Sequence, residues 1–251
     1  MIYLTGDTHG NFNGRFNRKS FFEKKELSKG DYLIICGDFG GIWDVDKEGK
    51  EEKYWLDWFE NQSYTLLFID GNHENFERIN SYPIKDWHGG KVHEIRPHIM
   101  HLMRGQVFDI CGKKIFTFGG ASSHDINGGI LEKDDPNLKQ KKKQLKRMKL
   151  SYRINHVTWW KEELPSQEEM DEGMINLEKH SFSVDYVITH CASSDVQAIV
   201  KPENGADILT EYFRDIKNII TYDKWFCGHY HMDKIINSKE QIISSKIIRI
   251  C

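Results

Sequence analysis

Five apolar segments of this chain, each with the pattern of a buried strand, are closely followed by side chains that can bind a metal ion. The segments are MIYLT, YLIIC, LLFID, DYVIT and KWFC. In open α/β sheets the ligand site lies outside the carboxyl ends of the strands, so we expect the side chains that follow to gather at one edge. They are carboxylates, imidazoles and one amide: Asp7, His9, Asp38, Asn72, His73, His190, His229 and His231.

The order of elements along the chain predicts how the first sheet is built. Amphipathic helical patterns at residues 17–29 and 49–62 separate the first three strand segments. This β-α-β-α-β order predicts parallel strands with right-handed crossovers. A hairpin is expected around Cys111-Gly112, between the runs 100–110 and 113–118, and a closing hairpin over residues 235–250.

We expect residues 1–251 to form a single domain, because no internal repeat and no linker-like Pro/Gly/Ser tract divides the chain. Residues 121–183 carry little strand signal and predict a helical insertion within that domain. There Ser166 precedes Glu169 by three residues, the spacing of a helix-capping box. Within the segment 126–150, residues 139–149 hold seven positive charges, which fit either a solvated helix face or a lip that attracts a polyanion.

Composition narrows the class of protein. The 35 Lys and Arg against 38 Asp and Glu leave a net charge of −3, which argues against a protein that coats DNA. No apolar run reaches the roughly 18 residues that span a membrane, and the N-terminus lacks the pattern of a signal peptide. The five cysteines include no pair at CxxC spacing, which favours reduced thiols. We therefore expect a cytoplasmic protein with no membrane partner.

The motifs at the strand ends occur in an order that is specific. D-x-H, GD, GNHE, a histidine at a strand end and GHxH follow one another from residue 7 to residue 231. This order resembles that of the calcineurin-like metallophosphoesterases, and the string GGASSHD at 119–125 with WWKEELPS at 159–166 is similar to a bacterial and phage branch of them. The resemblance implies a four-layer αββα sandwich with two central mixed sheets, and a binuclear metal site.

The resemblance also assigns the ligands of two divalent metal ions. It implies that Asp7, His9 and His231 hold one ion and that Asp38 bridges both. The ligands of the second ion would be Asn72, His190 and His229. Oxygen and nitrogen donors without a thiolate suit manganese, iron, zinc, nickel or cobalt, of which manganese is expected first.

The implied reaction is hydrolysis of phosphate esters by a hydroxide that bridges the two ions and attacks phosphorus. The resemblance gives His73 a catalytic role, protonating the leaving oxygen or stabilising its charge, and Asp38 a catalytic role as the bridge. Alternatively, His73 only supports Asn72. The same set of ligands also suits a phosphodiesterase for nucleotides or nucleic acid. A non-catalytic scaffold on this fold predicts broken motifs, whereas all seven ligand positions hold suitable residues.

One departure from the family pattern bears on the substrate. Many members continue GD as GDxxDR, but here Gly41 takes the place of the aspartate, with Asp44 as a shifted candidate for its role. The departure argues against a eukaryotic-type Ser/Thr protein phosphatase. We expect Arg153 and His124 to bind substrate, Arg153 as a bidentate clamp on phosphate. The partner is a phosphorylated small molecule, a nucleotide or a phosphoprotein, with nucleic acid left open, as is the oligomeric state.

Overall fold

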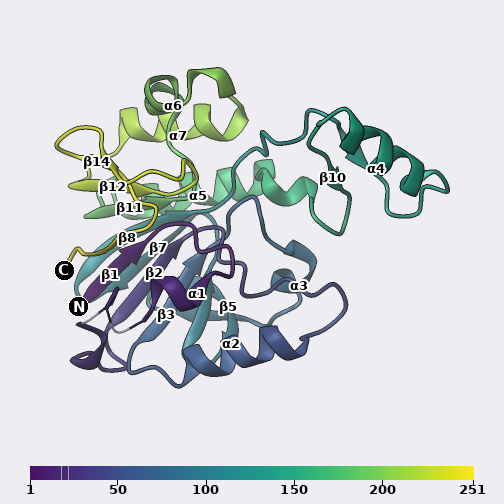
Figure 1. The fold of residues 1–251 in the computed structure, drawn as a ribbon. Coiled ribbons are helices and arrows are strands. Elements are labelled where there is room, and N and C mark those ends of the chain that lie inside the picture. Colours follow the sequence, from purple (N-terminus) through teal and green to yellow (C-terminus); the bar gives the residue numbers. More distant parts are fainter. Residues whose placement is uncertain (18, 22) are drawn as a thin grey trace.

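The computed structural model describes residues 1–17, 19–21 and 23–251, which contain two mixed β-sheets that face each other (Figure 1). Helices cover the outer face of each sheet, below the first sheet and above the second in that view. An apolar cluster between the sheets takes side chains from both, among them Ile34, Ile188 and Phe226. These layers confirm the predicted α/β fold with two mixed sheets.

The first sheet has seven strands in the order β15-β1-β2-β3-β6-β5-β4. Strands β1, β2, β3 and β6 are parallel, and the strands at the two margins run antiparallel to their neighbours. The bounds are β1 Ile2–Thr5, β2 Tyr32–Cys36, β3 Thr65–Ile69, β4 Ile84–Trp87, β5 Gly90–Arg96, β6 Ile99–Leu102 and β15 Ile247–Arg249.

The second sheet has six strands in the order β13-β14-β12-β11-β8-β7, with a parallel centre and antiparallel edges. The predicted hairpin around Cys111-Gly112 is confirmed, and both residues have positive φ (54° and 72°), as a tight two-residue hairpin turn requires. The bounds are β7 Gln106–Ile110, β8 Lys113–Phe118, β11 Tyr186–Thr189, β12 Lys224–Cys227, β13 Lys234–Ile235 and β14 Glu240–Ile242.

Helices α1 to α3 cover the first sheet, and α5 to α7 cover the second (Figure 1). The capping box of Ser166 and Glu169 is present at the start of α5. No helix in the described part of the chain is long and apolar enough to cross a membrane. The bounds are α1 Phe12–Arg15, α2 Lys50–Glu60, α3 Phe76–Asn80, α5 Gln167–Lys179, α6 Ser194–Val200 and α7 Ile208–Ile219, with short 3₁₀ helices at Glu23–Lys25, Lys161–Glu163 and Pro202–Asn204.

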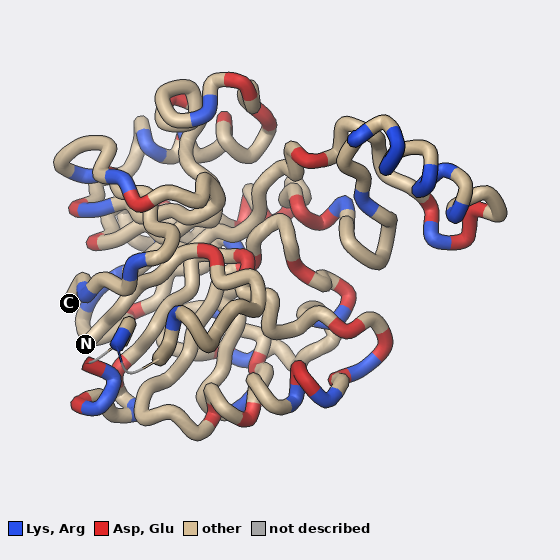
Figure 2. The backbone as a smooth tube through the Cα atoms, viewed as in Figure 1, with Lys and Arg blue, Asp and Glu red and all other residues tan. Residues whose placement is uncertain are grey.

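The lysine-rich segment lies on an arm that leaves the body of the molecule. The arm holds α4 (Leu138–Arg147) and a two-stranded parallel ladder of β9 (Ile130–Leu131) and β10 (Arg153–Ile154). Helix α4 buries none of its residues, and its positive charges are seen at the far end of the arm in Figure 2. Assignment of residues 121–183 as an insertion within one domain stays a prediction.

Three local predictions differ from the structure. The helix expected over 17–29 is absent from its described residues, which hold only the 3₁₀ turn Glu23–Lys25; Arg18 and Phe22 lie outside the described residues. Phe21 and Leu27 are buried there, so packing onto the first sheet outweighs helical propensity. The expected strand 100–110 divides into β6 and β7, which belong to different sheets. The closing hairpin is limited to β13 and β14, since β15 pairs with β1.

Candidate metal centre

The carboxyl ends of β1, β2, β3, β11 and β12 bring together the side chains that the sequence placed at strand ends. Two groups of metal-ligating atoms form there, each with all its atoms within 4.8 Å of one another. The first is Asp7, His9 and His231, and the second is Asp7, Asp38 and His190. Asp7 belongs to both groups, so the two form one continuous cluster.

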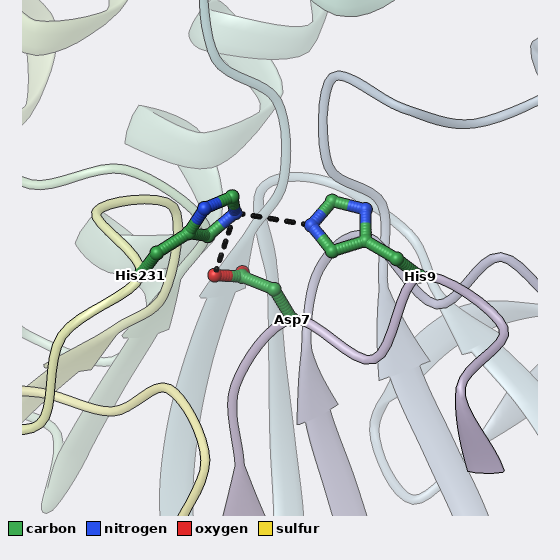
Figure 3. A group of neighbouring side chains, drawn as sticks. All are labelled: Asp7, His9 and His231. Carbon is green, nitrogen blue, oxygen red and sulfur yellow. Dashed lines mark hydrogen bonds and ion pairs between the residues drawn. The ribbon is translucent and has the colours of Figure 1, made fainter.

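In the first group His9 and His231 are exposed and Asp7 is buried, and the three side chains point toward one another (Figure 3). The Nε2 atom of His231 lies 3.0 Å from Nε2 of His9 and 3.7 Å from Oδ2 of Asp7. That Oδ2 is buried and has no hydrogen-bond partner among the described residues. A buried carboxylate oxygen without a donor is costly, and a cation bound between these three side chains would satisfy it. The residues present therefore fit a metal ion.

The second group is more deeply buried and is centred on His190, which is 0% exposed. Its Nδ1 lies 3.6 Å from Asp7 Oδ1, and its Nε2 lies 3.5 Å from Asp38 Oδ2 and 3.2 Å from Asn72 Oδ1. The same Asp38 Oδ2 lies 3.5 Å from Nε2 of His9. Asp38 thus belongs to the second group and also approaches His9 of the first, as a shared carboxylate needs. The backbone N–H of His229 donates to Asp7 Oδ1 (2.9 Å), which fixes the loop after β12 against β1.

Four of the clustered residues have a left-handed backbone, which is strained for side chains other than glycine. They are His9 (φ 45°), Asp38 (φ 50°), His229 (φ 66°) and His231 (φ 50°). Hydrogen bonds stabilise this backbone conformation at His9 and Asp38. The carbonyl of Asp38 accepts from the N–H groups of Thr8 (3.1 Å) and His9 (2.8 Å). Strain of this kind concentrates at functional sites, and no pattern in the sequence indicated it.

Two glycines are required by the closeness of the strand ends. A Cβ at Gly37, where φ is +88°, would lie 2.1 Å from Nδ1 of His190. A Cβ at Gly71 would lie 2.1 Å from Oδ1 of Asp38. Any side chain at either position would therefore displace a candidate ligand.

Burial and mutual contact set the charges in the cluster. Burial raises the pKa of Asp7, lowers the pKa of His9 to about 4 and holds that of His229 well below its usual range. Burial alone would raise the pKa of Asp38, but the neighbouring His190 outweighs burial and lowers it. In return the Asp38 charge overcomes burial and raises the pKa of His190 to about 9. Imidazoles that stay neutral keep a nitrogen lone pair for a metal, and a cation replaces any proton held between ligands.

His73 lies beside the cluster. Its backbone N–H donates to Asp38 Oδ1 (2.8 Å), and its ring lies 5.4 Å from that of His9. Nε2 of His73 lies 3.4 Å from Nη2 of Arg153, whose guanidinium donates to both carboxylate oxygens of Asp125. Burial lowers the pKa of His73.

His124, the other substrate candidate, and Asp44 are placed away from His73. His124 is exposed, with its ring 5.8 Å from that of His229. Asp44, the candidate replacement for the missing aspartate of GDxxDR, instead accepts from the N–H of Gly49 (2.9 Å). No hydrogen bond or ion pair between Asp44 and His73 is present among the described residues.

A hydrogen-bonded chain that the sequence did not predict supports Asn72. Its Nδ2 donates to Oγ of Ser123 (3.2 Å), and that hydroxyl donates to Oε2 of the buried Glu163 (2.6 Å). The backbone N–H of Ser123 donates to the other oxygen of Glu163 (3.0 Å). Together with Nε2 of His73, which lies 3.1 Å from the same Nδ2, the chain fixes the amide so that Oδ1 of Asn72 faces His190. The only sequence signal was the two strings GGASSHD and WWKEELPS, which contain Ser123 and Glu163.

Two cavities meet at the cluster and share His73, Asp125 and His231. The larger has a volume of about 650 Å³ and extends along Trp43 and Trp55. The smaller, of about 320 Å³, is lined by polar side chains, among them His124, Lys201, Asn204, His229 and Tyr230. Arg153 lines the larger cavity, whereas no described residue of α4 lines either.

Comparison with known proteins agrees with these motifs. The sequence profile of the calcineurin-like phosphoesterases matches residues 1–233. Lariat debranching enzyme A of Xenopus laevis is 25% identical over 144 residues, 53% of this chain and 26% of that protein. The lariat debranching enzyme of Danio rerio is 24% identical over 143 residues, 52% of this chain and 24% of that protein. The matched part of the chain thus spans about a quarter of these curated relatives. A solved structure, phosphopantetheinyl hydrolase from Mycobacterium tuberculosis, is 12% identical with a TM-score of 0.40, covering 97% of this chain and 87% of that one.

Proposed function

Because this chain belongs to the calcineurin-like phosphoesterase family and is a phosphoester hydrolase, we propose that the cluster at the strand ends holds two divalent metal ions. The proposed ligands are Asp7, His9 and His231 for one ion, Asn72, His190 and His229 for the other, and Asp38 for both. The observation that carries the proposal is the buried Oδ2 of Asp7, which has no hydrogen-bond partner among the described residues and lies 3.7 Å from Nε2 of His231. Bound there, divalent ions supply Lewis acidity to phosphoryl oxygens and make water nucleophilic near neutral pH.

The remaining roles in hydrolysis belong to the side chains around the cluster. His73 contacts the cavity with its ring and is held through its backbone by Asp38, so it donates a hydrogen bond or a proton to the leaving oxygen. Arg153 places Nη2 beside His73 and binds a phosphoryl oxygen. His124 contacts the substrate from the smaller cavity.

Hydrolysis of phosphodiesters is a second candidate function. A diester carries two ester groups on one phosphorus, and two cavities meet where the phosphorus would lie. The curated relatives are named as lariat debranching enzymes, which is compatible with a nucleotide or nucleic-acid substrate for this chain. A paired assay with p-nitrophenyl phosphate and bis(p-nitrophenyl) phosphate separates monoester from diester preference.

Metal analysis tests the proposal most directly. The chain, stripped with a chelator and reloaded separately with manganese, iron, zinc, nickel or cobalt, is expected to bind two equivalents, with manganese giving the highest hydrolysis. His231→Asn should lower the stoichiometry or affinity, whereas His180→Asn, at the end of α5, should not. A chain that binds no metal would support the scaffold interpretation. A loaded chain that cleaves neither ester would contradict the proposal.

A further inference from the structure

The larger cavity combines a phosphate-facing end with an aromatic wall. His9, His73 and His231 line the end at the candidate metal centre, and Arg153 lies beside them. Phe12, Trp43 and Trp55 line the rest together with glycines and carboxylates, and the rings of Phe12 and Trp55 lie 5.1 Å apart. A volume of about 650 Å³ lies within the range of about 300–1,000 Å³ that is typical of small-molecule sites.

The wall formed by Trp43 is held in place by contacts within the protein. The buried carboxylate of Glu52 accepts from the backbone N–H groups of Trp43 and Asp44, both at 3.0 Å. Glu52 also pairs with Arg78 (2.6 Å), which donates to the carbonyl of Asp44 (2.7 Å). The indole of Trp43 packs edge-on against that of Trp160, with ring centroids 6.1 Å apart. Because these contacts order the loop in advance, binding a ring there costs little conformational entropy.

The floor of this cavity is backbone, which leaves room for a planar group. Gly10, Gly40 and Gly41 line it, and the backbones of the first two are so close that a Cβ at Gly40 would lie 2.5 Å from N of Gly10. The GDxxDR pattern would place a carboxylate at position 41. A Cβ at Gly41 would lie 2.3 Å from Cζ of the buried Phe39, so a side chain at this position is excluded by the packing of that ring.

The charges along the cavity separate it into two parts. Away from the metal centre the lining charges are the carboxylates of Asp44, Glu51 and Glu52, of which Glu52 is paired with Arg78. The guanidinium of Arg153 is at the metal end and is paired with Asp125. The carboxylate end disfavours a second anionic group and suits N–H donors. An uncharged aromatic ring with amino groups carries no negative charge and offers N–H donors to the carboxylates. A polyphosphate or an acidic peptide is itself anionic and is therefore disfavoured.

We propose that this cavity binds the nucleoside group of the substrate, with the base stacked against Trp43 and Trp55 and the phosphate at the metal centre. The inference rests on the proposed phosphoesterase function for the position of the phosphate, but the affinity for the nucleoside does not depend on bound metal. Trp43 and Trp55 are specificity residues, because they contact the base and leave the reacting atoms to other side chains. Stacking of a base on an aromatic side chain is worth enough for about a tenfold effect when the ring is removed.

The test measures adenosine binding to the full, metal-free chain by equilibrium dialysis, and hydrolysis by the manganese-loaded chain. Trp43→Ala should weaken adenosine binding about tenfold, and Trp43→Phe should retain most of it. Trp87→Ala is the matched control, since Trp87 is also a half-buried tryptophan, in the first sheet, but lines neither cavity and packs against Tyr32 and Phe108. With loaded enzyme, Trp43→Ala should lower kcat/KM for adenosine monophosphate about tenfold more than kcat/KM for ribose 5-phosphate, which has no base. Circular dichroism of each variant reports whether it folds.

The outcomes for the cavity and for the phosphoesterase function are distinguishable. If ribose 5-phosphate is hydrolysed but adenosine does not bind, or binds equally to Trp43→Ala and Trp43→Phe, the nucleoside site is wrong and the phosphoesterase function stands. If adenosine binds and Trp43→Ala weakens it while no ester is hydrolysed, the nucleoside site is supported and the phosphoesterase function fails.

Discussion

Removal of one hydroxyl group should weaken metal binding from outside the ligand set. Ser123→Ala deletes the Oγ that accepts from Nδ2 of Asn72 and donates to Glu163. Without it the amide of Asn72 loses one of the two groups that orient Oδ1 toward His190, the other being Nε2 of His73, which lies 3.1 Å from Nδ2. Glu163 is 5% exposed and keeps the backbone donor of residue 123.

The expected losses of stability and of metal affinity in Ser123→Ala follow from the hydrogen bonds that Asn72 and Glu163 lose. A hydrogen bond to a charged, buried group contributes about 1.5–3 kcal/mol, so the free energy of unfolding of the metal-free chain should fall by about that amount. Burial already raises the pKa of Glu163, and a protonated Glu163 would recover part of the loss. Removal of groups that orient a ligand typically costs about 10–100-fold in metal affinity, and we expect a loss in this range.

Metal affinity is measured by competition with a chelating dye, and stability by urea unfolding of the metal-free chain. Ser122→Ala is the matched control, because the neighbouring hydroxyl donates to Asp207 and not to Asn72. Both variants should lose stability, but only Ser123→Ala should lose metal affinity. Equal metal affinities in the two variants would refute the reasoning and leave Ser123 with a structural role only.

Three further predictions concern the cluster and the core. Asp38→Asn should reduce hydrolysis by several orders of magnitude with little change in the urea midpoint, and a parallel loss of both would mean that Asp38 is mainly structural. Gly37→Ala should abolish two-metal stoichiometry, because its Cβ would lie 2.1 Å from Nδ1 of His190; normal stoichiometry would contradict the crowding at this turn. Burial, with His101 beside it, lowers the pKa of His93 to about 4, so the unfolded chain takes up the proton first as pH falls. The contribution of His93 to the free energy of unfolding should therefore be constant above about pH 6.5 and fall between about pH 6.5 and 4, by at most about 3 kcal/mol. The difference between the unchanged chain and His93→Asn in urea titrations should change over this pH range only.

The strands and their ligand-bearing ends were predictable because each strand is a continuous apolar run. Tyr32–Cys36 and Lys224–Cys227 begin and end where the sequence pattern placed them, and both are covered on two faces. Polar residues after such runs must lie at the carboxyl edge, so the sequence also predicted which side chains would be neighbours. The roles assigned to those side chains stay predictions.

What the sequence could not predict depends on contacts between distant segments. Ser123 is hydrogen-bonded to Asn72, 51 residues away in the sequence, and to Glu163, 40 residues away. No local sequence pattern predicts contacts between residues so far apart in the chain. The wall at Trp43 likewise depends on a loop held by Glu52 and Arg78. The local spacing around Leu27 predicted a helix, yet burial against the first sheet decided the conformation there.

The two ends of the larger cavity should respond differently to metal. Without cations, the carboxylates of Asp7 and Asp38 repel a phosphate group, since both lie at the edge where the phosphorus would bind. Divalent ions reverse the sign of the local charge, so phosphate affinity should appear only with metal. Binding of a base at the aromatic end, beside Trp43 and Trp55, should not depend on bound metal. An intact nucleotide therefore binds through two contributions, of which stacking is present at all times and phosphate attraction is conditional on the metal. The near-neutral net charge of the whole chain conceals this division, because the seven positive charges of residues 139–149 lie on the arm and line neither cavity.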